Sequence, residues 1–333
     1  MEKQQIIDLF HANFGTHPEE VELLPASGSA RKYYRVFNGG ETYIGTYNAN
    51  IEENRLFLRF TSHFATKGLA VPRIWAVAKN ELVYLQEDLG NQMLLDVVQA
   101  ERQGDVLTPH LMQLYRKVLK ELVRFQLLGH GGFDYTPCVP RPVFDKRSML
   151  WDLNYFKYCF LRLVGANFSE NALENDFEKL VGRLEAVDTN SFMFRDFQSR
   201  NIMVQQDEVW FIDYQGGRKG ALQYDVASLL YDAIVAIPDE QREILLDDYM
   251  QELQNYRSIE VEKFRLDYYH FVLIRLLQAM GAFGLRGIHE RKQHFIDSIV
   301  PGLKTLANLL DGERLNRDYP EIKKIVNELL ERI

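Results

Sequence analysis

Cysteine is scarce in this chain, and long apolar runs are missing. Among 333 residues there are two cysteines, Cys138 and Cys159, with no CxxC pair and no histidine cluster at zinc-binding spacing. We therefore interpret both as reduced thiols and expect neither a disulfide framework nor a zinc site. Residues 1–15 lack the basic start and apolar stretch of a signal peptide. No run approaches the ~18 apolar residues of a membrane span, so we expect a cytoplasmic protein with no membrane partner.

Positive charge is in the minority. The chain has 39 Lys and Arg residues against 47 Asp and Glu residues, for a net charge of -8. A general nucleic-acid-binding surface would be basic, so we do not expect a nucleic-acid partner. Charge alone does not choose between a neutral and a cationic small molecule. The hydrophobic share of 46% and the charged share of 26% are ordinary for a soluble globular protein. The length allows two lobes or two domains.

The residues that carry chemistry lie in the stretch FRDFQSRNIM, which begins at Phe194, and in FIDYQGG, which begins at Phe211. They place Asp196, Asn201 and Asp213 at the spacing used by enzymes that transfer a phosphoryl group from ATP. Asp196 would orient an attacking hydroxyl group and accept its proton. Asn201 and Asp213 would hold Mg²⁺, which prefers carboxylate and amide oxygens. The stretch therefore predicts ATP and Mg²⁺ as cofactors.

The surroundings of this motif strengthen the prediction. A bare RDxxxxN pattern arises by chance, and its alternative interpretation is a solvated loop. Here residues 202–204 and 209–212 have the composition of two strands, and Gln206 and Asp207 form a turn signal between them. Such a hairpin carries the two metal-ligand candidates at opposite ends, so both can reach one ion.

Strand patterns come first along the chain and helical patterns follow. Residues 51–67 show helical periodicity, and from Leu94 onward helical patterns dominate. The predicted strands span residues 21–24, 33–37, 42–47, 74–77 and 82–87. We predict an α+β fold with two lobes: a small β-rich lobe over residues 1–89 that binds nucleotide, and a larger, mainly helical lobe over residues 90–333.

A turn of small residues lies between the first two predicted strands. It contains Ser27, Gly28 and Ser29. Because small residues let backbone N–H groups approach a phosphate closely, we predict that these three contact the nucleotide. The alternative is an ordinary turn, since the segment does not match GxGxxG.

Five segments together resemble the aminoglycoside phosphotransferase family, which has a protein-kinase-like fold and phosphorylates small molecules. The segments are SGSARKYYRV, YLQEDLG, RDFQSRN, FIDYQGG and YDVASLLYD. Within that family the chain is most similar to the kinases of cell-wall recycling that phosphorylate N-acetylmuramate and N-acetylglucosamine at the anomeric hydroxyl. The late segment RLLQAMGAFGLRG, residues 275–287, also supports this subgroup.

The resemblance implies roles for residues at matching positions. The backbone of Glu87 and Leu89 would bind adenine at the connector between the lobes. Asp225 would brace the catalytic loop; its alternative role is a helix N-cap, which Asp favours. Arg200, inside the loop, is a candidate for stabilising charge or for pairing with Asp225.

Two departures from the kinase pattern stand out. Phe194 replaces the leading histidine of the catalytic loop, a residue that is chiefly structural in such folds. Residues 42–47, TYIGTY, contain no lysine where kinases place the one that pairs the α- and β-phosphates. The sugar-kinase subgroup also tends to lack this lysine, but so do inactive kinase relatives. Arg31 is the candidate nucleotide-binding cation, with Lys32 and Arg35 beside it; at least two of the three have solvated strand charges as their alternative.

The acceptor pocket is predicted in the helical lobe. Trp151, Tyr155 and Tyr158 fall on one stripe of a helix, and an aromatic face such as that of Tyr155 stacks well on a sugar ring; the alternative is a core stripe. Arg275 and Gln278 share another helix face, and Arg275 can fork onto the lactyl carboxylate of N-acetylmuramate; the alternative is a surface arginine.

We therefore expect an ATP-dependent kinase of an amino sugar. One alternative is a kinase for another alcohol, such as an aminoglycoside, choline or an amino-alcohol. An alternative of another class is a nucleotide-binding pseudokinase that regulates and does not transfer phosphate. The partner is expected to be a small-molecule sugar or alcohol, and the oligomeric state is not indicated.

Overall fold

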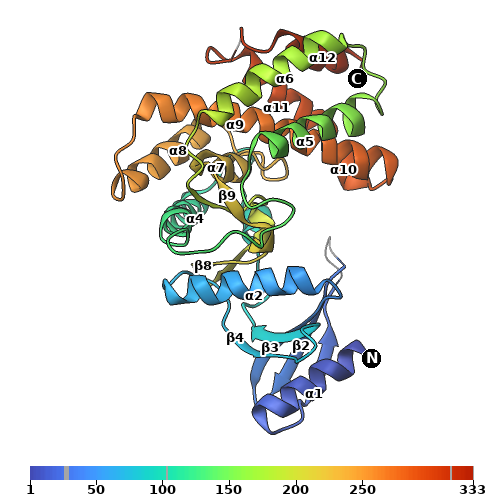
Figure 1. Cartoon of the computed structure of the whole chain (residues 1–333), viewed down its shortest axis with the longest axis vertical. Coiled ribbons are helices and arrows are strands. Elements are labelled where there is room, and N and C mark those ends of the chain that lie inside the picture. Colours follow the sequence, from blue (N-terminus) through green and yellow to red (C-terminus); the bar gives the residue numbers. More distant parts are fainter. Residues whose placement is uncertain (26–29, 103, 316, 333) are drawn as a thin grey trace.

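A small sheet lies at one end of the molecule and a helical lobe at the other, with one helix crossing between them (Figure 1). The computed structural model describes residues 1–25, 30–102, 104–315 and 317–332. The sheet precedes the helical lobe along the chain. This is the predicted α+β arrangement of a β-rich N-terminal lobe followed by a mainly helical lobe.

The small lobe is built on a five-stranded antiparallel sheet in the order β1-β2-β3-β5-β4. Its strands agree with the predicted runs to within one residue at each end. The turn between β2 and β3 places Gly39 at φ 61° and Gly40 at φ 80°. A two-residue hairpin turn with both φ values positive strongly favours glycine, which explains why the Gly-Gly pair marks this turn. The strands are β1 (Glu20–Leu23), β2 (Lys32–Asn38), β3 (Glu41–Tyr47), β4 (Ile74–Val77) and β5 (Val83–Glu87).

Helix α1 (Glu2–Phe14) covers one face of this sheet. Ile6 and Phe10 are fully buried on its apolar side. A Cβ atom at Gly45, in β3, would lie 2.5 Å from the Ile6 side chain, so glycine allows the helix to approach the strand closely. The amphipathic N-terminal segment is therefore an integral part of the small lobe.

Helix α2 (Ile51–Thr66) belongs to the small lobe by sequence but shares its core with the helical lobe. Phe57 stacks on Tyr214 with ring centroids 5.1 Å apart, and the hydroxyl groups of Thr61 and Tyr214 lie 2.6 Å apart. Burial of such aromatic rings contributes about 1.5–3 kcal/mol each. The lobe boundary at residue 89 falls in the connector after β5 and stays a prediction, but α2 ties the two lobes into one continuous core.

The helical lobe is arranged around α9 (Val261–Ala282), which packs against α5, α7 and α11. Together with the π-helix η4 (Phe283–His289) it forms a segment long and apolar enough by composition to cross a membrane, which the sequence pattern had not suggested. However, 61% of its most apolar window is buried inside the protein, so it is a core helix. The other helices of this lobe are α3 (Leu94–Glu101), α4 (Pro109–Leu127), α5 (Lys146–Phe156), the π-helix η1 (Lys157–Leu161), α6 (Glu170–Glu185), α7 (Leu222–Leu230), α8 (Asp239–Gln254), α10 (Gln293–Asp297), α11 (Ile299–Asp311) and α12 (Pro320–Glu331).

Two small antiparallel pairs sit between the lobes and carry the motif residues. Strand β7 (Ile202–Gln205) pairs with β8 (Glu208–Phe211), as the hairpin prediction required. Gln206 and Asp207 form the turn with φ 52° and 62°. Strand β6 (Ser191–Met193) pairs with β9 (Arg218–Gly220) and leads directly into the catalytic loop. One short 3₁₀ turn lies within each half of the motif: η2 (Ser199–Asn201) directly before β7, and η3 (Tyr214–Gly216) directly after Asp213.

One buried histidine in α9 makes the stability of this lobe sensitive to acid. His270 is 2% exposed, its Nδ1 lies 2.8 Å from the Tyr319 hydroxyl, and burial lowers its pKa to about 4. The unfolded chain, with an ordinary histidine pKa near 6.5, therefore takes up this proton first as the pH falls. We expect the free energy of unfolding to drop by about 2–3 kcal/mol from this group between pH 7 and pH 4.5. Denaturant unfolding of the wild type and His270→Gln at both pH values measures it, and an equal loss in the two proteins would contradict the assignment.

Candidate active site

The side chain of Asp225 holds the predicted catalytic loop in place. Its carboxylate is fully buried and accepts hydrogen bonds from the backbone N–H groups of Phe194 (2.7 Å) and Arg195 (3.1 Å). Burial raises the pKa of Asp225 to about 7, and the two N–H donors oppose that shift. The N-cap alternative is wrong, because α7 begins at Leu222 with Ala221 as its N-cap. The predicted pairing of Asp225 with Arg200 is not formed either, since Arg200 is exposed.

Arg195 ties the same loop to helix α5. Its backbone adopts φ 82°, a strained conformation for a non-glycine residue and one that occurs preferentially at functional sites. Its guanidinium group forms a two-bond fork with Asp152 of α5 (2.7 and 2.5 Å) and donates to the Tyr224 hydroxyl. The motif contains the arginine, but nothing local in the sequence marks Asp152 as its partner. Sequence reasoning missed this pair, which supports the loop that carries Asp196.

Phe194 occupies the position of the absent histidine as a packing residue. It is 3% exposed, and its ring contacts those of Phe125, Phe192 and Phe197 at centroid distances of 4.8–5.2 Å. An aromatic cluster of this kind supports the loop by burial and ring contacts. The departure from the kinase pattern therefore replaces one structural side chain with another.

Asn201 precedes β7 and Asp213 follows β8, and the pairing of Ile202 with Phe211 brings both to the open end of the β7–β8 hairpin. The Asn201 side-chain nitrogen donates to the backbone oxygen of Asp196 (2.9 Å), and the Ile212 N–H donates to the Asn201 backbone oxygen (3.2 Å). The first contact holds the loop and leaves the amide oxygen of Asn201 available to a metal ion. Asp213 adopts φ 63°. One amide and one carboxylate oxygen suit a hard divalent cation such as Mg²⁺, so these residues fit the metal that the motif implies.

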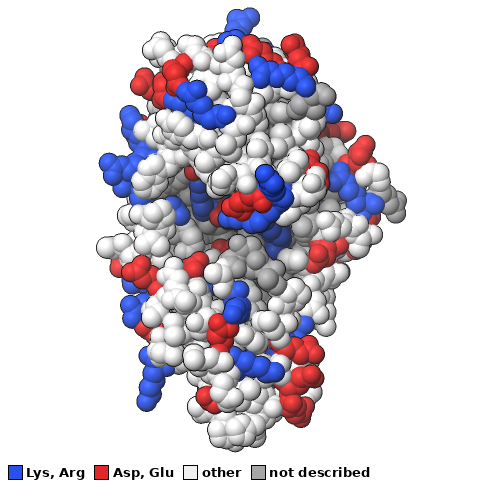
Figure 2. Space-filling model, turned by 90° about the vertical axis from the view of Figure 1, so that its right-hand side faces the viewer, with Lys and Arg blue, Asp and Glu red and all other residues white. Residues whose placement is uncertain are grey.

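Neighbouring groups shift the pKa of Asp213 in opposite directions. Burial in the cleft raises the pKa of this carboxyl group, and Asp196 adds to the shift. Gln215 opposes it by donating to Asp213 Oδ1 (2.6 Å), and the positive charges of Arg31 and Arg200 oppose it as well. Figure 2 shows the molecule hollowed between the lobes, with basic and acidic side chains gathered at the hollow.

Only one of the three basic residues after the first turn faces this site. Arg31 is 4% exposed, and its guanidinium contacts Glu53 (2.9 Å) and Asp213 (3.4 Å). Lys32 instead pairs with Glu2 of α1 (2.7 Å), and Arg35 forms a fork with Asp88 (2.6 and 3.1 Å). Lys32 and Arg35 are therefore engaged elsewhere: Lys32 is an exposed strand charge, as the alternative interpretation held, whereas Arg35 forms a largely buried ion pair.

The connector between the lobes is held in place by its own contacts. Arg35 also donates to the Gly90 backbone oxygen (3.2 Å), and the Glu87 N–H donates to the Arg73 backbone oxygen (2.8 Å). Within the part of the chain that the structure describes, the N–H of the buried Leu89 donates to no protein acceptor. The Leu89 N–H is therefore available as a donor to adenine. The Glu87 N–H is not, because it already donates to the Arg73 backbone oxygen. Ser27, Gly28 and Ser29 lie outside the described residues.

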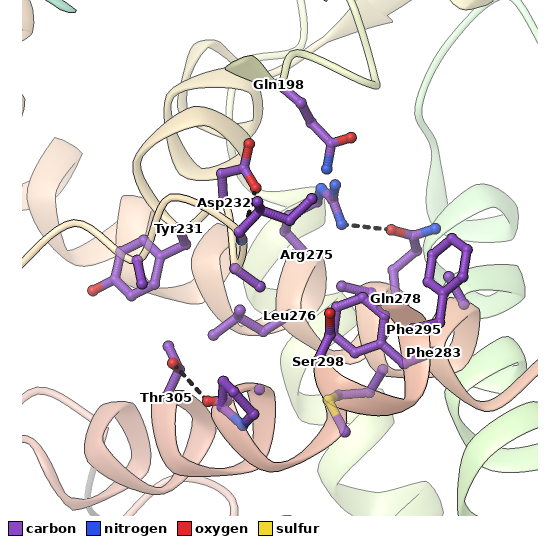
Figure 3. Close-up of a pocket in the computed structure, with 18 of the residues that line it drawn as sticks. Gln198, Tyr231, Asp232, Arg275, Leu276, Gln278, Phe283, Phe295, Ser298 and Thr305 are labelled. Atoms are coloured by element: carbon purple, nitrogen blue, oxygen red, sulfur yellow. Dashed lines mark hydrogen bonds between the residues drawn. The ribbon is translucent and has the colours of Figure 1, made fainter. Parts of the chain in front are cut away.

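A cavity of about 310 Å³ opens beside Asp196 on the side of the helical lobe (Figure 3). Gln198 and Arg200 of the loop line it together with Arg275 and Gln278 of α9. Figure 3 shows Arg275 and Gln278 joined by a hydrogen bond and the Arg275 guanidinium directed towards the Gln198 amide. The two α9 residues therefore reach the same cavity as the candidate base, as their shared helix face predicted.

Asp232, the other carboxylate in the lining of this cavity, accepts hydrogen bonds from groups of the protein itself. Its Oδ2 accepts from the Ser199 hydroxyl (2.7 Å) and N–H (3.3 Å), and its Oδ1 accepts from the Ile234 N–H (3.1 Å). Arg275, 7% exposed, donates to the Ser228 hydroxyl (3.0 Å) and to the Gln278 side-chain oxygen (2.8 Å). Three arginines line the cavity, the third being Arg242. The lining therefore favours a neutral or anionic ligand over a cationic one.

The aromatic stripe of α5 does not line this cavity. Tyr155 packs against α9, where a Cβ atom at Gly281 would lie 2.6 Å from its ring. Trp151 and Tyr158 are 47% and 56% exposed. The stripe is thus neither a buried core stripe nor a wall of the cavity beside Asp196. Aromatic faces in the cavity come instead from Tyr231, Phe283 and Phe295.

Comparison with known proteins agrees with this geometry. The N-acetylmuramate/N-acetylglucosamine kinase of Pseudomonas putida is 25% identical over 335 residues, which cover 98% of this chain and 94% of that protein. The N-acetylmuramate/N-acetylglucosamine kinase of Pseudomonas aeruginosa is 27% identical over 249 residues, which cover 73% of this chain and 69% of that protein.

Solved structures share the fold at lower identity. The amicoumacin kinase hAmiN, solved in complex with AMP-PNP, Ca²⁺ and Ami, has a TM-score of 0.62 and 13% identity, with 93% of this chain and 94% of that one covered. The fold is thus protein-kinase-like. A family model described as the phosphotransferase enzyme family, APH, matches residues 20–260. Since that match spans most of the chain and contains the whole motif, the chain belongs to the APH phosphotransferase family.

Proposed function

We propose that this APH-family kinase uses ATP and Mg²⁺ to phosphorylate the anomeric hydroxyl group of an amino sugar of the N-acetylmuramate or N-acetylglucosamine type. The observation that carries the proposal is the cavity beside Asp196, which combines three arginines, two glutamines and aromatic rings. The names of the Pseudomonas relatives support the same acceptor class. A kinase that draws on ATP would act in the cytoplasm.

The charge of the cavity separates this proposal from kinases of cationic alcohols. Aminoglycosides and choline carry positive charge, which a buried site offsets with carboxylates or, for a quaternary ammonium, also with aromatic faces. Asp232 accepts three hydrogen bonds from the protein, so it is already committed. Arg275 and Arg242 add positive charge to the same walls. An uncharged sugar, or one with a carboxylate, satisfies these groups without an unpaired charge.

Each residue of the site then has one task in the transfer. Bound Mg²⁺·ATP supplies the phosphoryl group and the positive charge that neutralises its oxygens. Asn201 and Asp213 hold the cation through their oxygens. Asp196, held by the loop anchors at Asp225 and Asp152, orients the sugar hydroxyl group and accepts its proton. Catalysis by this arrangement is mostly positioning and electrostatic stabilisation.

The direct test is a transfer assay with a panel of acceptors. The purified chain is incubated with ATP, Mg²⁺ and, separately, N-acetylmuramate, N-acetylglucosamine, an aminoglycoside and choline, and products are followed by phosphorus NMR. An acid-labile anomeric sugar phosphate is the expected product. Turnover with choline or the aminoglycoside alone would favour a kinase of another alcohol. ATP binding without turnover of any acceptor would favour a regulatory pseudokinase.

Arg275 should discriminate between acceptors with and without a carboxylate. We expect Arg275→Met to raise KM for N-acetylmuramate by roughly 10- to 100-fold, because a charge-assisted fork to the lactyl carboxylate is lost. N-acetylglucosamine lacks that carboxylate, so its KM should change only a few-fold. Steady-state kinetics with both sugars provide the measurement. Arg286→Met, in η4 with its own partner Glu290, serves as the matched control. An equal rise for both sugars would remove Arg275 from carboxylate recognition.

A further inference from the structure

The strand that normally supplies a lysine to the ATP phosphates has no cation in this chain. Thr46 of β3 lies between Tyr33 of β2 and Tyr84 of β5 in the sheet register, on one face of the sheet. All three side chains are uncharged at neutral pH. A triphosphate carries several negative charges, so a kinase of this kind needs a cation near this face.

Arg31 lies against that same face at the residue directly before β2. Arg31 lies two residues before Tyr33, so the alternation of an extended chain puts its side chain on the face that carries Tyr33 and Thr46. Its electrostatic interactions with Tyr33 and Tyr84 agree with this placement. One end of the group contacts Glu53 Oε1 (2.9 Å) and the other contacts Asp213 Oδ1 (3.4 Å). Arg31 therefore bridges helix α2 and the candidate metal ligand.

Glu53 is itself held rigidly. It sits in the first turn of α2, where its N–H donates to the side chain of the N-cap Asn50 (3.2 Å). Its Oε2 accepts from the Asn48 side chain (2.8 Å), and Asn48 is 3% exposed at the end of β3. Asn48 thus holds the carboxylate that orients Arg31, and Asn50 holds the backbone of the same residue.

We propose that Arg31 replaces the missing strand lysine: it contacts the ATP phosphates, and Glu53 positions it for that contact. This inference rests on the proposed use of ATP. A guanidinium group presents five N–H donors in a planar fork, so it can contact a carboxylate and a phosphate at the same time. Its position beside Asp213 puts the charge where the metal-bound phosphates must lie. Arg200 also acts electrostatically on Asp213, but it lies in the loop and lines the acceptor cavity, whereas Arg31 lies against the sheet of the small lobe.

Nucleotide binding without acceptor tests the proposal. Isothermal titration of the full chain, with Mg²⁺ present, gives Kd for ATP, ADP and adenosine. We expect Arg31→Ala and Arg31→Gln to weaken ATP binding by roughly 10- to 100-fold, the size expected for one lost charge-assisted phosphate contact. Adenosine has no phosphate, so its Kd should stay within about 2-fold. Arg31→Lys keeps the charge and should recover part of the loss. Thermal melting of each variant confirms that it is folded, and the Gln variant substitutes for the Ala variant if the latter does not fold.

Two further variants separate phosphate contact from simple repulsion. Removing Arg31 leaves Glu53 without its partner, and its charge alone would repel ATP. The double variant Arg31→Ala/Glu53→Gln removes both charges; it should remain as weak as Arg31→Ala if Arg31 itself contacts the phosphates. Recovery of wild-type affinity in the double variant would overturn the proposal. Lys32→Ala is the matched control, because this neighbouring cation pairs with Glu2 on α1.

The failure of this inference is distinguishable from the failure of the proposed function. If the wild type binds ATP and Arg31→Ala or Arg31→Gln binds it equally well, the Arg31 assignment is wrong while the kinase proposal stands. If the wild type binds no ATP in the presence of Mg²⁺, the proposed function itself is wrong. A parallel loss of adenosine binding in the Arg31 variants would assign the residue to the structure of the cleft and overturn the phosphate contact.

Discussion

Replacing Asp196 with asparagine is expected to lower kcat by about 10²- to 10⁴-fold, the usual contribution of a positioned general base. Asparagine has nearly the same shape but cannot accept the proton of the sugar hydroxyl group. Asp196 is exposed to the cleft, and its backbone oxygen accepts from Asn201, so the substitution leaves that loop contact in place. The Kd for Mg²⁺·ATP should therefore change little. Single-turnover kinetics and nucleotide titration measure the two quantities separately.

The control for Asp196 comes from the same hairpin region. Asp207 lies at the exposed turn between β7 and β8 with φ 62°, a conformation that asparagine tolerates well. Asp207→Asn should keep full activity. Turnover near the wild-type rate in Asp196→Asn would remove this residue from the role of base. A loss of both turnover and ATP binding would point to a collapsed loop.

Replacing Asp225 with alanine is expected to cost about 2–5 kcal/mol of unfolding free energy and to abolish transfer. The change leaves two buried backbone N–H groups, those of Phe194 and Arg195, without their acceptor. Each unsatisfied buried donor costs about 1–3 kcal/mol. Because both donors lie in the catalytic loop, the loss of stability and the loss of activity share one cause. Chemical denaturation and the transfer assay at a temperature where the variant is folded provide the two measurements.

The asparagine variant at the same position gives a graded comparison. Asp225→Asn retains one side-chain oxygen, so it should satisfy one N–H group and lose roughly half as much stability as the alanine variant. Wild-type stability in Asp225→Ala would show that the two donors find other acceptors, and full activity in a stable Asp225→Ala would show that the loop needs no anchor.

Much of the fold followed from short-range patterns. The strands predicted for the small lobe match the structure to within one residue at each end, and the Gly39-Gly40 pair suits the β2–β3 turn because both positions have positive φ. The β7–β8 hairpin followed from the same signals. These features depend on neighbours a few residues apart, so a linear pattern contains them.

The partners of the charged residues did not follow from such patterns. Three basic residues close together in the sequence, Arg31, Lys32 and Arg35, have the same local character, yet their partners are Glu53, Glu2 and Asp88. Which of them faces the cleft depends on where α1, α2 and the connector pack. The surroundings of the aromatic stripe of α5 could not be predicted for the same reason, since the exposure of each ring depends on its neighbours in space.

Composition and spacing alone thus led to the kinase motif, the α+β order and the residues Asp196, Asn201 and Asp213. The packed structure was needed to show that Arg195 pairs with Asp152, that Asp232 is already committed, and that Arg31 joins α2 to Asp213. The physical reason is the distance along the chain over which each kind of interaction acts. Backbone conformation responds to local sequence, whereas ion pairs and cavities form between segments that only the buried core brings together.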